Sequence, residues 1–94
     1  MDNQFNNKTA LIVGGSSGIG KETAKQLLQQ GAKWVALIGY QDTKIEQAKK
    51  ELSLFGEVKS FKADLTKWED VIKAIDFVKS LEQTDILVNA VGVF

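Results

Sequence analysis

A glycine-rich stretch near the N-terminus combines residue types that can hold a phosphate. The apolar run 11–13 leads into Gly14-Gly15-Ser16-Ser17-Gly18-Ile19-Gly20, and helical periodicity follows. This pattern predicts a strand, a tight turn and the first turn of a helix. The first N–H groups of a helix have no partner within the helix, and they lie at the positive end of its dipole. Because glycines let the backbone approach an anion closely, we expect a dinucleotide-binding βαβ unit here.

The sequence has few other side chains of the types that catalyse reactions, bind metals or form disulfides. Cys and His are both absent, which excludes disulfides, thiolate chemistry and the commonest general base and metal ligand. The Asp and Glu residues do not follow the spacing of a metal site. The 12 basic residues are all Lys, are scattered along the chain and are balanced by 12 acidic residues, so we do not expect nucleic-acid binding.

Length and hydropathy limit the architecture. With 94 residues, 44% of them apolar, the chain is expected to form one domain, residues 1–94, near the small end of what supports its own core. The first seven residues are polar and do not resemble a secretory signal, and no apolar run approaches the roughly 20 residues of a membrane span. We therefore expect a cytoplasmic protein that does not enter a membrane.

Short apolar runs alternate with helical periodicity along the chain. Strands are predicted at 9–13, 34–38, 58–62 and 86–89, with a helix between each pair. The order βαβαβαβ predicts an α/β fold with a parallel sheet, right-handed crossovers and helices on the faces of the sheet.

Local signals predict where the helices begin and end. Gly31 is expected to end the first helix in a left-handed conformation. Capping-box spacing makes Thr43 the predicted N-cap of the second helix and Thr66 that of the third. The second helix is expected to run to Gly56, with Phe55 in its apolar stripe.

Three motifs together resemble the short-chain dehydrogenase/reductase family. Residues 13–20 look like its Thr-Gly-x-x-x-Gly-Ile-Gly loop, Ala63-Asp64-Leu65-Thr66 like its Asp-Val or Asp-Leu step after the third strand, and residues 85–92 like its Asp-x-Leu-Val-Asn-Asn-Ala-Gly segment. The chain departs from this pattern at Val13, Ala90 and Val91, which replace Thr, Asn and Ala. The resemblance implies a Rossmann-like three-layer αβα fold with strand order 3-2-1-4, truncated after the fourth strand.

The resemblance also implies a set of cofactor-binding residues at the carboxyl ends of the strands. The loop would line the pyrophosphate and the adenosine ribose, Asp64 would accept a hydrogen bond from the adenine amino group, and Leu65 would close over the ring. The full implied set is Gly14, Ser16, Ser17, Ile19, Gly20, Tyr40, Asp64, Leu65, Asn89, Ala90 and Gly92.

Each of these residues has a purely structural alternative. The glycine turn can serve close packing of a strand and a helix. Asp64 can form the turn ahead of Thr66, and Asn89 can be a hydrogen-bonding residue at a strand end. The functional interpretation is favoured because the three motifs occur together and in order.

The end of the second strand indicates which nicotinamide cofactor is bound. An acidic side chain at this position would take the ribose hydroxyls of NAD, and a basic one the 2′-phosphate of NADP. The chain has Gly39-Tyr40-Gln41 there, Asp42 comes slightly late, and Lys44 can attract a phosphate. Of NADP and NAD, the sequence favours NADP.

Two further patterns are misleading. Residues 15–22 nearly match a phosphate-binding P-loop, but Glu22 follows Lys21 where that motif needs Ser or Thr for magnesium. Tyr40 and Lys44 have the Tyr-x-x-x-Lys spacing of the family's catalytic pair, yet they lie on the adenosine side of the predicted site. We interpret both matches as coincidence.

The family's catalytic Ser and Tyr-x-x-x-Lys have no counterpart in these residues. We therefore expect the N-terminal, NAD(P)-binding half of an oxidoreductase, inactive alone. The alternatives are a non-catalytic nucleotide-binding module and an interaction fragment without nucleotide. A fourth strand with an unpaired apolar edge at 86–89 predicts self-association or a partner chain.

Overall fold

Four parallel strands and three helices make up the described part of the chain. The computed structural model describes residues 5–14 and 18–90. The elements are β1 (Thr9–Val13), α1 (Gly18–Gln29), β2 (Trp34–Gly39), α2 (Asp42–Leu52), β3 (Glu57–Lys62), α3 (Trp68–Ser80) and β4 (Ile86–Asn89). The four predicted strands are confirmed to within one residue at each end.

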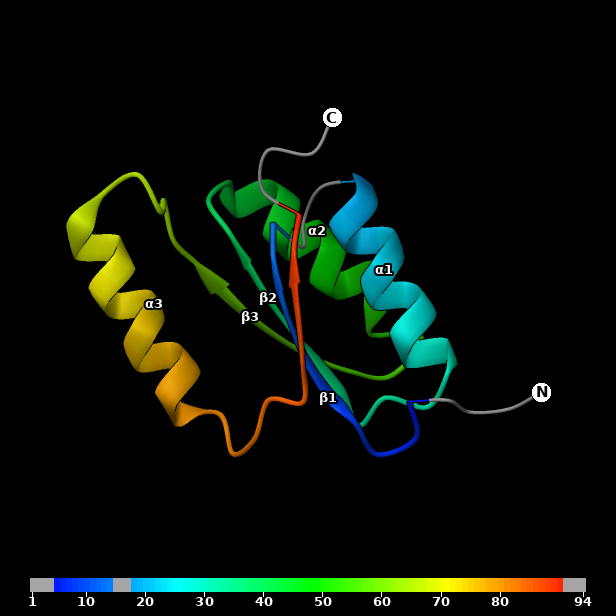
Figure 1. Cartoon of the computed structure of the whole chain (residues 1–94). Coiled ribbons are helices and arrows are strands. Elements are labelled where there is room, and N and C mark those ends of the chain that lie inside the picture. The colour runs from blue at the N-terminus through cyan, green and yellow to red at the C-terminus, as the bar shows by residue number, and fades with distance from the viewer. Residues whose placement is uncertain (1–4, 15–17, 91–94) are drawn as a thin grey trace.

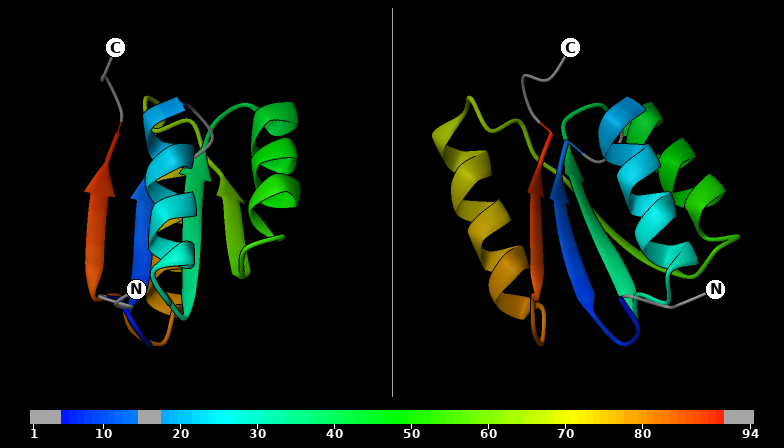
Figure 2. Two further views of the ribbon diagram at one scale, coloured as in Figure 1. Left: turned by 90° about the vertical axis from the view of Figure 1, so that its right-hand side faces the viewer. Right: turned by 45° about the vertical axis from the view of Figure 1, so that its right-hand side comes forward.

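The sheet has the order β3-β2-β1-β4, and neighbouring strands are parallel. Helices α1 and α2 lie on one face of the sheet and α3 lies on the other (Figure 1). Turned by 90°, the molecule shows α1 and α2 in front of the sheet, with β4 at one edge and β3 at the other (Figure 2). The predicted three-layer fold and strand order are confirmed.

The two central strands are buried on both faces. Ile12, Val35 and Leu37 belong to the cluster under α1 and α2, while Ala36 and Ile38 face the α3 side. Each of these side chains is at most 3% exposed. Complete burial of a Val, Leu or Ile side chain contributes about 1.5–3 kcal/mol, so these strands account for much of the stability of the fold. Burial on both sides also explains why their sequences are continuous apolar runs.

Gly31 ends α1 as predicted, with φ of 95°. The predicted start of α2 is wrong, because the helix begins at Asp42 and its N-cap is Gln41, which makes no side-chain capping bond. The predicted end is also wrong, since α2 stops at Leu52. Phe55 therefore lies outside the helix and is 39% exposed.

The predicted start of α3 is wrong by the same rule. Its N-cap is Lys67, without a side-chain capping bond. Thr66 lies one residue before the N-cap, and its hydroxyl donates a hydrogen bond to Asp64 Oδ1 at 2.6 Å. The helix begins with Glu69 and Asp70 in its first turn, where acidic side chains interact favourably with the helix dipole.

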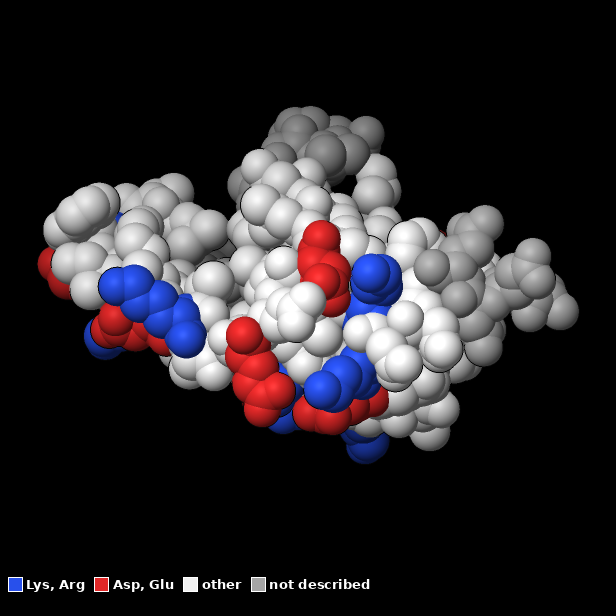
Figure 3. Space-filling model, turned by 60° about the horizontal axis from the view of Figure 1, so that its bottom comes forward, with Lys and Arg blue, Asp and Glu red and all other residues white. Residues whose placement is uncertain are grey.

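The charged side chains are mixed in sign. On the face at the amino ends of the strands, Lys lies among Asp and Glu, so no large field of one sign forms there (Figure 3). Across the described ranges, no three His, Cys, Asp or Glu side chains form a group that could hold a metal ion. None of the described helices has the length and apolar character needed to cross a membrane.

Candidate functional site

The carboxyl ends of all four strands lie at one edge of the sheet. Backbone hydrogen bonds continue between the strands just beyond their ends: Gly14 N–H donates to the carbonyl of Ile38 at 2.7 Å, and Ala90 N–H donates to that of Val13 at 2.8 Å. A third bond joins Ala63 N–H to the carbonyl of Gly39 at 2.7 Å. These bonds fix where each loop leaves the sheet, so the predicted site residues that follow the strands are held along one edge.

Gly14 turns the chain away from β1 toward α1. Its φ of 83° lies in the left-handed region, which side chains other than glycine adopt only with strain. Helix α1 begins at Gly18 and has no acidic residue in its first turn, so no carboxylate there offsets the positive end of its dipole. Of the other predicted loop residues, Ile19 is 52% exposed and Gly20 is buried in the first turn.

Gly18 has open space where a side chain would be. A Cβ built on it would meet no heavy atom of the described residues within 4 Å, its chain neighbours and nearby helix backbone aside, and its φ is not in the left-handed region. Neither packing nor backbone strain therefore requires glycine at this position. The open side of Gly18 leaves the backbone of the first helical residue accessible, which is compatible with close approach of a phosphate. Gly18 was not among the predicted site residues, although its place in the glycine motif was a usable signal.

Lys21 of α1 is paired with a carboxylate of α2. Its Nζ lies 2.8 Å from Glu51 Oε2 on α2. The hydrogen bond and charge of Lys21 lower the pKa of Glu51. The lysine is thus paired across the two helices, which supports interpreting the P-loop match as coincidence.

Asp64 forms a turn directly after β3. Its Oδ1 accepts hydrogen bonds from the Thr66 hydroxyl at 2.6 Å and the Thr66 N–H at 3.0 Å. These bonds lower the pKa of Asp64, so the group is a carboxylate at neutral pH. Oδ2 accepts no hydrogen bond from the described residues. The turn-forming role is therefore observed, and it leaves one carboxylate oxygen able to accept.

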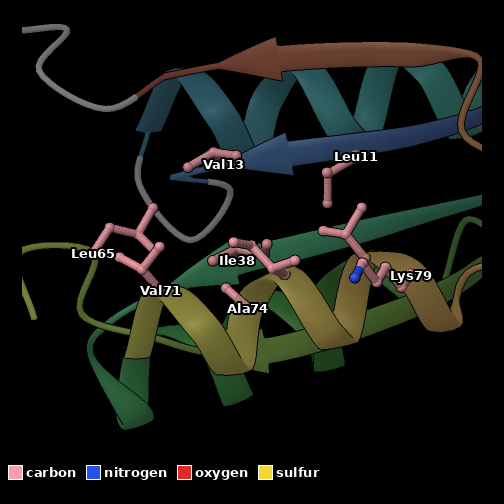
Figure 4. A pocket seen from close by; sticks show the side chains of 9 residues that line it. Leu11, Val13, Ile38, Leu65, Val71, Ala74 and Lys79 are labelled. Carbon is pink, nitrogen blue, oxygen red and sulfur yellow. The ribbon is translucent and has the colours of Figure 1, made fainter. Parts of the chain in front are cut away.

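Asp70 positions this loop from the first turn of α3. Its Oδ2 accepts a hydrogen bond from the Asp64 backbone N–H at 2.7 Å. Asp70 was missed at the level of the sequence, where the only signal was an acidic residue at a helix start. Leu65, the neighbour of Asp64, is 41% exposed and lines an apolar groove with Val13 and Ile38 (Figure 4).

The turn after β2 carries Tyr40, which is 60% exposed. Its hydroxyl accepts a hydrogen bond from Gln41 Nε2 at 3.1 Å. Asp42 Oδ2 lies 3.0 Å from Lys62 Nζ, so the nearest carboxylate is paired with a lysine. Lys44 is exposed and forms no ion pair with any residue in 5–14 or 18–90.

At the end of β4, Asn89 is exposed and lies in register with Val13 of β1, and Ala90 is buried. The strand ends therefore bring together Gly14, Tyr40, Asp64, Leu65, Asn89 and Ala90 along one edge, beside the start of α1. The predicted site residues Ser16, Ser17 and Gly92 lie outside the described residues.

Comparison with known proteins identifies the family. The model of the short chain dehydrogenases matches residues 8–94. The chain belongs to the short-chain dehydrogenase family. It is 40% identical over 94 residues to the uncharacterized oxidoreductase YvrD of Bacillus subtilis, an alignment that spans all of this chain and 35% of that protein. The short-chain dehydrogenase chain thus spans about a third of the length of the curated relatives it matches.

Solved structures of the family show the same arrangement of elements. The complex of Pseudomonas aeruginosa RhlG with NADP matches 95% of the chain at a TM-score of 0.81 and 29% identity, and the match covers 37% of that protein. NAD⁺-bound xylitol dehydrogenase matches 89% of the chain at a TM-score of 0.80 and 30% identity, covering 33% of that protein. The family therefore includes close structural neighbours with either dinucleotide.

Proposed function

We propose that this short-chain dehydrogenase chain binds the adenosine and pyrophosphate portion of a nicotinamide dinucleotide, as the cofactor-binding part of an oxidoreductase that acts on carbonyls or alcohols. The observation that carries the proposal is the open space at Gly18, the first residue of α1, whose first turn has no acidic residue, together with the left-handed bend at Gly14. The nicotinamide cofactor supplies hydride transfer; the chain supplies binding and orientation.

The backbone of the loop and of the first turn of α1 would hold the pyrophosphate. Gly14 and Gly18 allow close approach, and Ile19 and Gly20 present the first N–H groups of the helix. Ser16 and Ser17 keep the role that the sequence motif implies for them, which is to donate hydroxyl hydrogen bonds to the phosphates.

The ends of β3 and β4 would hold the adenosine. Asp64 Oδ2 is available to accept a hydrogen bond from the adenine amino group while Oδ1 maintains the turn. Leu65 offers an exposed apolar surface to the ring. Asn89, Ala90 and Gly92 would pass along the ribose on the other side of the loop.

We propose NADP as the preferred cofactor. Tyr40 and Gln41 follow β2, and neither is the carboxylate that would favour the ribose hydroxyls of NAD in this turn. Asp42 is paired with Lys62, so its charge is compensated. Lys44, exposed in the first turn of α2, is available to attract the 2′-phosphate.

Calorimetric titration of the protein with NADPH and with NADH tests both proposals. We expect binding of both dinucleotides, with the lower Kd for NADPH. Absence of heat with either would refute the cofactor site, and a lower Kd for NADH would refute the NADP preference. A panel of alcohols and ketones, assayed with the longer protein that is proposed to contain this chain, then separates an oxidoreductase from a non-catalytic nucleotide-binding module, because only the former changes the absorbance of the nicotinamide.

A further inference from the structure

The turn at Asp64 is joined to helix α3 by a hydrogen bond. Asp70 Oδ2 accepts this bond from the Asp64 backbone N–H at 2.7 Å. The other hydrogen bonds that Asp64 makes with described residues stay within residues 64–67: the Thr66 N–H and hydroxyl donate to Oδ1, and the Lys67 N–H donates to the Asp64 carbonyl at 3.0 Å. These local bonds close the turn but move with it. The bond to Asp70 therefore holds the turn against an element outside it.

Packing on β3 fixes the position of α3. The Phe61 ring of β3 and the Phe77 ring of α3 are stacked, with their centroids 5.0 Å apart. Ala63, just beyond β3, and Ala74 of α3 are buried in the same apolar cluster. These contacts place the first turn of α3, which carries Asp70, beside the loop that leaves β3. Side chains on packed elements hold a site more precisely than side chains on loops.

The Asp70 carboxylate is chemically suited to hold this N–H. It lies in the first turn of α3, where a negative charge interacts favourably with the helix dipole. It belongs to none of the ion pairs between described residues, so no lysine competes for its oxygens. A hydrogen bond from an N–H to a carboxylate is roughly twice as strong as one to a neutral acceptor. Asp70 is also half-buried, whereas its neighbour Glu69 is exposed.

We propose that Asp70 is a positioning residue for recognition of the adenine base. The inference rests on the proposed function, in which Asp64 Oδ2 accepts a hydrogen bond from the adenine amino group. Asp70 restrains the backbone of Asp64 and Thr66 restrains its Oδ1, so Oδ2 is held in one place. A hydrogen bond weakens steeply as its geometry departs from the ideal. Loosening the Asp64 backbone should therefore reduce selectivity for adenine more than it weakens binding of the rest of the dinucleotide.

An NADPH analogue with hypoxanthine in place of adenine tests this proposal. The analogue has a carbonyl oxygen where adenine has its amino group, so it cannot donate that hydrogen bond to Asp64. Calorimetric titration gives the Kd for NADPH and for the analogue in the wild-type protein, in Asp70→Ala and in Asp70→Asn. The matched control is Glu69→Ala, which removes an exposed acidic side chain from the same helical turn. Thermal melts check folding, and Asp70→Ser, with a side chain too short for the bond, replaces Asp70→Ala if that variant does not fold.

Selectivity for adenine should follow the bond from Asp70. The wild-type protein should bind NADPH with a Kd about tenfold or more below that for the analogue, the effect of a hydrogen bond to a charged group. In Asp70→Ala the Kd for NADPH should rise about fivefold or more, while that for the analogue changes less than about twofold. Asp70→Asn keeps an acceptor oxygen and should retain most of the selectivity. Glu69→Ala should retain all of it.

Other results would contradict the proposal in distinguishable ways. An equal rise of both Kd values in Asp70→Ala would show that Asp70 only maintains the loop, and unchanged selectivity would show that it does not position Asp64. Either result would overturn the proposal while the cofactor site stands. Equal Kd values for NADPH and the analogue in the wild-type protein would overturn the adenine contact and this inference together. Binding of neither dinucleotide would refute the proposed function and, with it, the role of Asp70.

Discussion

Asp85 holds the start of β1 against the loop that precedes β4. Its Oδ2 accepts hydrogen bonds from the Thr9 N–H at 2.9 Å and the Thr9 hydroxyl at 3.1 Å, across 76 positions of sequence. The Thr9 hydroxyl also lies 2.6 Å from the carbonyl of Gln83. These bonds connect the first and last strands of the sheet at the end opposite the candidate site, so they align β4 with β1.

We predict that stability depends on this contact in acid. The Thr9 N–H, chiefly, and the Gln83 side chain lower the pKa of Asp85 in the folded protein. The stabilisation is therefore complete above the unfolded pKa of about 3.9 and is lost as the pH falls through the lower folded pKa. We expect Asp85→Asn to lower the melting temperature at pH 7 and to flatten its decline below about pH 4. Thermal melts across pH measure this, with Asp76→Asn, at an exposed carboxylate on α3, as control.

Substitutions of Gly18 and Gly14 by alanine are predicted to have different effects on stability. Gly18→Ala should leave the free protein as stable or slightly more stable, because alanine favours a helix by up to about 1 kcal/mol and meets no atom here. It should nevertheless raise the Kd for NADPH tenfold or more, since the methyl group fills the space proposed for the phosphate. Gly14→Ala should destabilise the free protein by about 1–2 kcal/mol because of its positive φ. Unchanged NADPH affinity in Gly18→Ala would contradict the proposed site.

Asp64 is predicted to have two separable roles. Asp64→Asn keeps an oxygen that can accept the Thr66 hydrogen bonds, but it places an amide where the adenine amino group needs an acceptor. We expect it to weaken NADPH binding with little change in melting temperature. Thr66→Val should lower the melting temperature with a smaller effect on affinity. Equal loss of affinity in both variants would indicate that Asp64 acts only through the turn.

Cofactor preference is predicted to depend on Lys44. Lys44→Glu should raise the Kd for NADPH roughly tenfold and leave that for NADH nearly unchanged, because only NADPH carries the 2′-phosphate. Lys50→Glu makes the same charge change on the last turn of α2, away from the strand ends, and is the matched control. The difference between the two variants should shrink in high salt. Identical effects on both cofactors would remove Lys44 from the specificity site.

The 94-residue chain alone is predicted to associate. Within the described residues β4 pairs only with β1, which leaves its other edge available to a second strand. The exposed side chain of Leu87 adds an apolar contact beside this edge. Light scattering after size-exclusion chromatography should show dimers or larger species at micromolar concentration. A monodisperse monomer with a high melting temperature would contradict this prediction.

The predictions that failed concern where α2 and α3 begin and where α2 ends. The spacing of Thr66 and Glu69 fits a capping box, and the same spacing at Thr43 and Glu46 does as well. In the fold, Thr66 lies before Lys67, the N-cap of α3, and α2 begins before Thr43. The geometry of the preceding loop decides where each helix begins, and that geometry depends on where β2 and β3 end.

The sequence by itself determined the strands, because apolar runs and glycines are properties of local spacing, and its three ordered motifs carried the family resemblance that implied the strand order. The tertiary structure alone decided that Gly18 faces open space, that Asp64 keeps one acceptor oxygen, and that the α3 face has an uncovered apolar groove. These features arise from contacts between elements far apart in the chain. Their distances are set by how the helices pack on the sheet, which no local pattern specifies.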